Sequence, residues 1–165
     1  MRYLLPLIVV IGINSCTIRS ASLMQPNRRL VELQRERDKL RRSNDPVSKT
    51  KSHIVISDIL LELTRDAART GDMEILDQRL DEYVSTIREA HATMAATGRD
   101  AHKSPKGFRE LEIALRKQLN QLKDIGGALT FDQRDPVDKA RDEATRLRDE
   151  LLKALFGSQN ASNYF

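Results

Sequence analysis

Tryptophan is absent from this sequence of 165 residues, cysteine occurs once, and aromatic residues make up only 4%. A β-sandwich core would draw on more aromatic side chains, and a single cysteine excludes an intramolecular disulfide. Glycine and proline are few and lie between periodic apolar segments. Charged residues reach 32%, which is typical of a helical bundle of leucine, isoleucine and alanine with solvated outer faces. The composition therefore predicts a single all-α domain.

The common sequence signatures of catalysis and cofactor binding are also missing. There is no haem-attachment Cys-x-x-Cys-His, no phosphate-binding glycine loop and no nucleophile elbow. The three histidines lie in different segments, without the four-residue ligand spacing of helical metal sites and without the Glu-x-x-His pair of di-metal bundles. We expect no catalysis, metal or cofactor. We also expect His91 to be a hydrogen-bonded core residue, and His53 and His102 to lie in solvent or at helix caps.

The densest apolar stretch predicts a central helix over 46–70. Asp45 and Pro46 provide an N-cap and a first-turn proline, and Gly71 provides a stop. The β-branched run within it would also suit a short buried strand, but no other segment offers a partner strand. Its seven large apolar residues contribute about 10–20 kcal/mol when buried, and ordering a helix this long costs at least as much, so it needs partners. These residues are Ile54, Val55, Ile56, Ile59, Leu60, Leu61 and Leu63.

The remaining periodic segments predict the partners of the central helix. Apolar residues repeat at three- and four-residue intervals over 72–97, about 105–125 and 136–156. The short turn at Gly71 makes the first of these segments antiparallel to the central helix. Pro105 and Pro136 each follow a capping residue, Ser104 and Asp135, and so predict two helix starts. We therefore expect an antiparallel bundle of about four long helices over 45–157, preceded by a short basic helix over 28–44 and followed by a disordered tail, 158–165.

The N-terminus has the pattern of an export signal. Arg2 precedes an apolar segment of about ten residues, too short to span a membrane, so 1–15 reads as a signal peptide. The sequence Ile13-Asn14-Ser15-Cys16 resembles the lipobox of bacterial lipoproteins. That resemblance implies lipidation of Cys16 and a membrane anchor. The residues that follow are small and polar and include Pro26, so 16–27 reads as the lipidated N-terminus and a tether. The absence of Asp at position 17 favours the outer membrane, facing the periplasm, over the inner membrane. A plain secretory signal, or a cysteine there by chance, is the alternative.

A basic arm follows the tether. Residues 27–51 carry nine Lys and Arg against four Asp and Glu, whereas residues 52–165 are mildly acidic. The arm lacks interleaved aromatic residues, which argues against nucleic acid. Anionic lipid, another polyanionic surface or an envelope protein is the expected partner, and a solvated helix face is the alternative. The candidate contact residues are Arg28, Arg29, Arg35, Arg37, Lys39, Arg41 and Arg42.

Asp58, Glu62 and Asp66 form a row of carboxylates along the predicted central helix. Residues four apart lie on one helix face. We expect an exposed edge, in which Glu62 and Asp66 pair with Arg65 or Arg69. A stripe that binds a cation or docks a partner is the alternative.

The segment Leu129-Thr130-Phe131-Asp132-Gln133 is similar to the LTxxQ motif of the Spy/CpxP family of periplasmic chaperones and stress sensors. The resemblance implies a helical, exported protein that binds unfolded polypeptide. A capping box between Thr130 and Gln133 would, however, place Pro136 inside the following helix, where proline removes a hydrogen bond. Our leading interpretation is a non-catalytic cell-envelope lipoprotein that serves as a scaffold or interaction module. A Spy/CpxP-like chaperone is the alternative.

Overall fold

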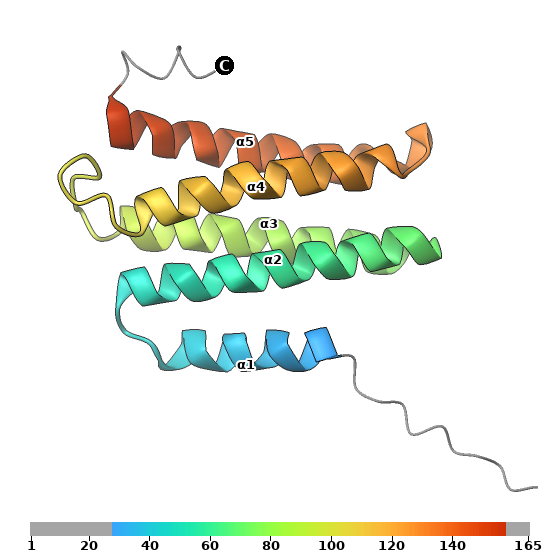
Figure 1. Cartoon of the computed structure of the whole chain (residues 1–165), viewed down its shortest axis with the longest axis horizontal. Helices are drawn as coiled ribbons and strands as arrows, with labels where there is room; N and C mark the ends of the chain where they lie inside the picture. The colour runs from blue at the N-terminus through green and yellow to red at the C-terminus, as the bar shows by residue number, and fades with distance from the viewer. Residues whose placement is uncertain (1–27, 158–165) are drawn as a thin grey trace, which may run out of the picture.

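The structure is a computed structural model that describes residues 28–157, which form five α-helices and one short 3-10 helix (Figure 1). The predicted all-α fold class is confirmed, and residues 28–157 contain no strand. The predicted signal peptide, Cys16, the tether and the tail 158–165 lie outside the described residues. The elements are α1 (Arg28–Arg42), α2 (Pro46–Thr70), α3 (Met73–Ala95), α4 (Phe108–Gly127), η1 (Phe131–Gln133) and α5 (Asp135–Phe156).

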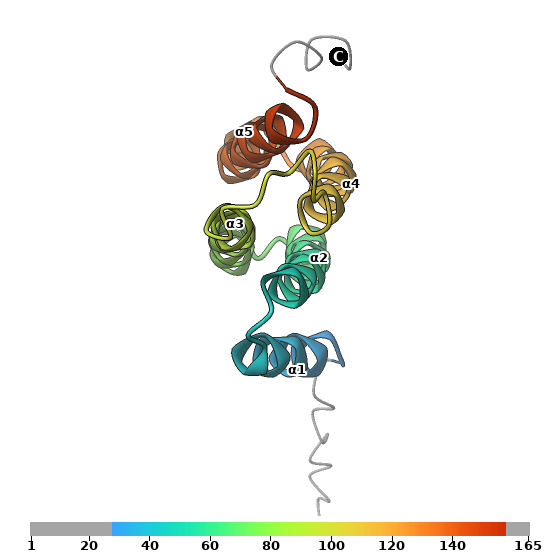
Figure 2. The same cartoon turned by 90° about the vertical axis from the view of Figure 1, so that its left-hand side faces the viewer.

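The helices are arranged in three layers (Figures 1 and 2). The first layer is α1 alone, the second is the antiparallel hairpin of α2 and α3, and the third is the antiparallel hairpin of α4 and α5. Between the hairpins, α2 lies beside α4 and α3 beside α5, and each of these pairs runs parallel. The hairpin predicted from the turn at Gly71 is confirmed, whereas the parallel stacking of the two hairpins was not predicted.

The central helix α2 is covered on three sides, by α1, α3 and α4. Leu60 and Leu61 have no exposed surface, and Ile56, Ile59 and Leu63 are also buried. At the edges of the predicted apolar stripe, Ile54 and Val55 are half-buried. The predicted apolar positions of α4 and α5 are buried as well: Phe108, Leu111, Leu115, Leu122, Ile125, Ala140, Ala144, Leu147, Leu151 and Leu155.

One buried polar network joins the two hairpins. The amide of Gln118 in α4 donates to Ser57 Oγ at 2.8 Å and to an Asp58 carboxylate oxygen at 2.9 Å. Its Oε1 accepts a hydrogen bond from the Tyr83 hydroxyl at 3.2 Å. Burial raises the pKa of Tyr83, so its hydroxyl stays protonated and remains a donor. The network therefore fixes the register of α4 against α2 and α3.

The predicted start of α2 is confirmed, but that of α4 is wrong. The Asp45 carboxylate accepts a hydrogen bond from the Ser48 amide at 2.8 Å, and Gly71 ends α2 with φ at 75°. The turn that starts at Pro105 does not continue as a helix, because Gly107 has φ at 91°. Helix α4 begins at Phe108, and the Glu110 carboxylate accepts the Gly107 amide at 2.6 Å.

The start of α5 resolves the conflict between a Thr130–Gln133 capping box and a proline at position 136. The Gln133 side chain accepts the Thr130 amide at 3.3 Å, but it closes the separate one-turn helix η1. Helix α5 starts afresh at Asp135, so Pro136 lies in its first turn, where no hydrogen bond is lost. Asp135 was predicted as the N-cap of α5, but it is the first residue of the helix. The N-cap is Arg134.

Candidate functional site

The basic helix α1 is attached to the bundle along one side only. Leu33 is its single buried residue, and Leu40 packs half-buried against the core. Arg29 forms ion pairs with Glu62, at 2.8 Å, and with Asp66. Arg37 donates to Glu82 of α3 at 2.8 Å. Arg29 and Arg37 therefore hold α1 on the bundle, and their predicted contact with an anionic partner stays a prediction.

The carboxylate row of α2 connects that helix to its neighbours. Glu62 and Asp66 receive Arg29 from α1, and Asp58 receives Lys117 from α4 at 3.1 Å. Of the pairs predicted within α2, the structure contains that between Asp66 and Arg69, at 3.2 Å. The row is therefore part of the attachment between layers rather than a free edge.

Three of the seven predicted contact residues form the outer surface of α1. Arg28, Arg35 and Arg42 are seven residues apart, lie opposite Leu33 and are exposed. Within residues 28–157, no ion pair engages any of the three, whereas Lys39 pairs with Glu36 and Arg41 with Asp38. The exposed Val31 lies among them. We call Arg28, Arg35 and Arg42 the α1 stripe.

A second basic stripe, on α4, was missed from the sequence. Arg109, Arg116 and Lys123 repeat at the same seven-residue interval, and all three are exposed on the side of α4 opposite its buried leucines. No ion pair engages them within the described part of the chain, and Ile113 projects between them with 45% of its surface exposed. The interval is visible in the sequence, but the mildly acidic balance of residues 52–165 concealed it. We call Arg109, Arg116 and Lys123 the α4 stripe.

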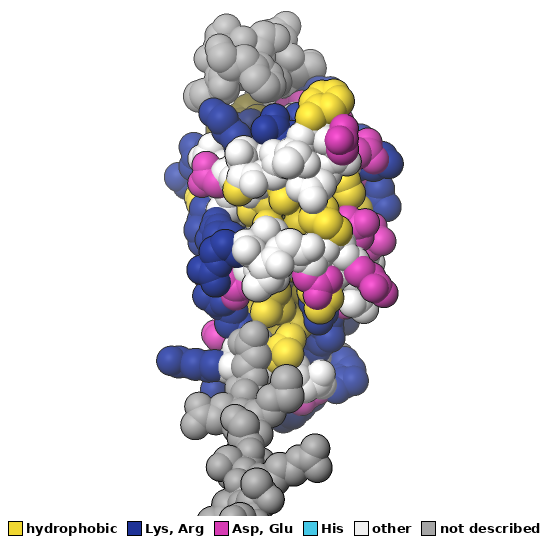
Figure 3. All heavy atoms as spheres, turned by 90° about the vertical axis from the view of Figure 1, so that its right-hand side faces the viewer, with side chains coloured by type: hydrophobic (Ala, Val, Ile, Leu, Met, Phe, Trp, Pro, Cys, Tyr) yellow, Lys and Arg dark blue, Asp and Glu magenta, His cyan; other side chains and the backbone are white. Residues whose placement is uncertain are grey.

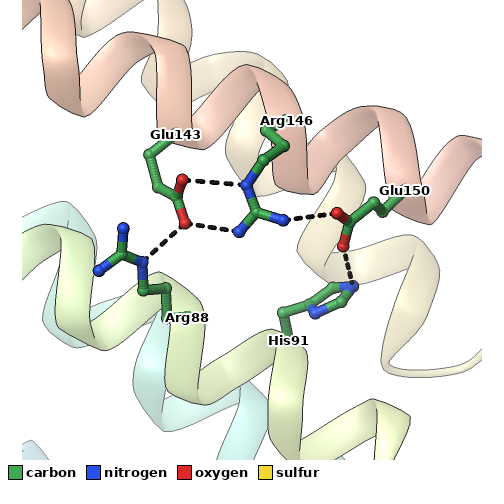
Figure 4. Close-up of polar contacts among 5 residues, drawn as sticks. All are labelled: Arg88, His91, Glu143, Arg146 and Glu150. Atoms are coloured by element: carbon green, nitrogen blue, oxygen red, sulfur yellow. Dashed lines mark hydrogen bonds and ion pairs between the residues drawn. The ribbon is translucent and has the colours of Figure 1, made fainter.

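Parallel packing of α3 and α5 leaves a groove of about 700 Å³ between them. An ionic cluster crosses one end of it (Figure 4). The Glu143 carboxylate accepts from Arg88 of α3 and from Arg146, both at 2.7 Å. These hydrogen bonds lower the pKa of Glu143 to about 2 and raise that of Arg146. Because Glu143 stays ionised and fully engaged, it ties α3 to α5 and is unsuited to act as a general base.

The structure corrects two of the three histidine predictions. His91 is half-buried at the surface between α3 and α5, and its Nε2 lies 3.5 Å from Glu150 rather than in the core (Figure 4). His53 is only 4% exposed and lines a cavity of about 250 Å³ between α1, α2 and α3. His102 is exposed as predicted and contacts the last turn of α5 through the Leu155 carbonyl, at 3.0 Å.

Buried His53 should make the protein less stable at mildly acidic pH. Its Nδ1 has no hydrogen-bond partner within residues 28–157, and burial lowers its pKa below 6.5. The unfolded state therefore binds the proton more readily, so the contribution of neutral His53 is complete above about pH 6.5 and lost as the pH falls below it. Urea unfolding at about pH 7 and pH 5.5 should show this loss in the wild type and in His102→Gln, but not in His53→Gln. The carboxylates with lowered pKa values titrate below this window.

Comparisons with protein-family models, curated proteins and solved structures found no match to this chain. Within residues 28–157, no cluster of three or more His, Cys, Asp or Glu side chains is placed to hold a metal ion. None of the described helices is both long and apolar enough to cross a membrane. The most distinctive chemical feature of the described surface is therefore its pair of unpaired basic stripes.

Proposed function

We propose that this protein is a lipid-anchored, non-catalytic scaffold of the bacterial cell envelope, held at the outer membrane on its periplasmic side. The α1 stripe rests on the anionic surface beside the anchor and orients the bundle. The observation that carries this proposal is the set of three exposed arginines, Arg28, Arg35 and Arg42, aligned on the outer side of α1 without ion pairs to other described residues.

The position of α1 in the chain supports this orientation. It directly follows the expected tether, whose twelve residues span at most about 40 Å when extended, so the stripe remains close to the anchored membrane. Each basic residue near an anionic surface contributes about 1 kcal/mol, so three contribute about 3 kcal/mol. Acyl chains contribute about 0.8 kcal/mol for each buried CH₂ group, which exceeds that sum severalfold. The lipid therefore anchors the protein, and the stripe sets its orientation.

Lipidation is tested by radiolabelled palmitate and membrane fractionation in a bacterial host that expresses the full chain. The wild type should take up label and fractionate with the membrane, because Cys16 supplies the thiol for the thioether bond. Cys16→Ala should lose both label and membrane association. A wild type that takes no label and stays in the cytoplasm would contradict the proposal.

The stripe is tested by flotation of the chain from residue 27 onward with vesicles containing anionic lipid. Replacing Arg28, Arg35 and Arg42 with alanine should weaken binding about 100-fold at low salt, in line with about 1 kcal/mol for each residue. Replacing Arg109, Arg116 and Lys123 with alanine is the matched control, because it removes the same charge at the same spacing from α4. Equal losses in the two variants would show that only net charge matters.

One observation favours the alternative, a Spy/CpxP-like periplasmic chaperone. Phe131, at the centre of the LTxxQ-like segment, is 87% exposed, and the Thr130–Gln133 contact holds it on a defined turn. An exposed aromatic side chain is suited to contact unfolded polypeptide. In a light-scattering assay, a scaffold should give no protection against aggregation at stoichiometric amounts. Protection that is lost in Phe131→Ser would favour the chaperone.

A further inference from the structure

Opposite sides of the bundle carry opposite charge. The side formed by α2 and α4 carries the α4 stripe together with exposed Lys51 and Arg65. The side formed by α3 and α5 carries exposed acidic residues. Seen from one end, acidic side chains gather along one edge of the molecule, and the opposite edge is mostly basic (Figure 3). The acidic residues are Glu74, Asp77, Asp81, Asp135 and Asp142.

Interactions within a single chain explain only part of this separation of acidic and basic residues. Glu74 and Asp135 lie in the first turns of α3 and α5, where the helix dipole favours negative charge. Asp81 and Asp142 lie beyond the first turn, and neither forms an ion pair with another described residue. The α4 stripe is likewise unpaired. The α3–α5 side also carries Arg88, Arg146 and Lys139, which pair with Glu143 and Asp135, so Asp81 and Asp142 are the carboxylates left to an external partner of opposite charge.

The two sides also match in shape. Ile113 projects from the α4 stripe, and the groove between α3 and α5 has apolar side chains at its base, including Leu80, Val84 and Ala140. Arg116 and Lys123 on one side, and Asp135 and Asp142 on the other, share a seven-residue spacing, which is about 10.5 Å along a helix. Asp135 also pairs with Lys139 at 2.6 Å, whereas Asp142 forms no ion pair with another described residue. Because the α2–α4 and α3–α5 sides face in opposite directions (Figure 2), a second copy related by translation brings these two sides together.

We propose that copies of this chain associate side by side in a head-to-tail manner, with the α2–α4 side of one copy against the α3–α5 side of the next. Ile113 enters the groove, and the α4 stripe meets Asp81 and Asp142. The occupant is a second copy because one chain presents both complementary surfaces, with the same spacing. Such an interface is heterologous, so each copy keeps one free side and the assembly grows as a row.

The proposed interface is small, so we expect the affinity between copies to be low. Each side is two helices wide and about 30 Å long, so the contact buries on the order of 1,200 Å² in total, at the lower end of specific interfaces. Charges around such an interface determine orientation and salt dependence more than affinity. We expect association to weaken at least about tenfold between low and moderate salt, because the Debye length shortens to about 8 Å at physiological ionic strength.

Two charge-reversal variants test the proposal in the chain expressed in full and purified in a non-ionic detergent. One variant, Arg116→Glu with Lys123→Glu, makes the basic side acidic. The other, Asp81→Lys with Asp142→Lys, makes the acidic side basic. In sedimentation at low salt, the wild type should form species that grow with concentration, and each variant alone should be monomeric. A mixture of the two should again form species that grow with concentration, because the two intact sides complement each other and the two reversed sides do so as well.

The matched control is Arg28→Glu with Arg35→Glu, which makes the same charge change on α1 and should leave the rows intact. A wild type that is monomeric at every concentration at low salt would overturn the proposal, and that measurement needs no variant. A wild type that stops at two copies, or a mixture that stays monomeric, would also overturn it. All the substituted residues are exposed, and none forms an ion pair with another described residue, so thermal unfolding should verify that each variant folds.

Discussion

Replacing Gly107 with alanine is expected to lower the free energy of unfolding by about 2–6 kcal/mol. The backbone of Gly107 has φ at 91° and ψ at −50°, a region that costs an L-residue about 1–3 kcal/mol. An added Cβ would also lie 2.6 Å from the Met94 side chain. Met94 has no exposed surface, so its displacement disturbs the core and adds a penalty of about 1–3 kcal/mol.

Gly71→Ala is the matched control, because Gly71 also has positive φ, 75°, but nothing lies within 4 Å of the site of a Cβ. It should cost only about 1–2 kcal/mol, the penalty of the left-handed conformation alone. Urea unfolding of both variants compares the two costs directly. Equal losses would show that the contact between Gly107 and Met94 is not tight in solution.

Replacing Gln118 with alanine is expected to cost about 2–4 kcal/mol of unfolding free energy. Gln118 is 1% exposed, and its side chain connects Tyr83, Ser57 and Asp58 across three helices. Its removal leaves the buried Tyr83 hydroxyl without this acceptor and creates a cavity, and both effects destabilise the folded state.

Gln121→Ala, on the same helix, is the control. The Oε1 of Gln121 has no hydrogen-bond partner within residues 28–157, so this change should cost less than about 1 kcal/mol. A double-mutant cycle of Gln118→Ala with Tyr83→Phe should give a coupling energy of about 1 kcal/mol. Additive losses would mean that the hydrogen bond between Tyr83 and Gln118 contributes nothing.

The helices could be predicted from sequence because their apolar periodicity and most of their end signals agree. Asp45, Pro46 and Gly71 combine a cap, a first-turn proline and a stop around one apolar run. The same type of signal failed at Ser104 and Pro105, because the backbone of Gly107 leaves the helical region, with φ at 91°. Parallel stacking of the hairpins was not predictable, because the loop between α3 and α4 permits several arrangements.

The candidate site was less predictable than the fold, because net charge does not show where each side chain points. Residue spacing within the basic arm would have separated Arg28, Arg35 and Arg42 from the residues on the Leu33 side. It would not have shown that Arg29 and Arg37 find carboxylates on α2 and α3, since those contacts join residues far apart in sequence. The burial of His53 was equally hidden, because its neighbours come from three helices.

The stacking of two hairpins also determines the order in which the chain folds. The main helix contacts among the described residues join elements that are adjacent or next but one in sequence. Such local contacts need little loop closure and form quickly. A chain that emerges N-terminus first completes the α2–α3 hairpin before α5 has appeared. The first hairpin therefore forms before α4 and α5 and provides the surface against which they pack. Its amides should gain protection from hydrogen exchange earliest during refolding.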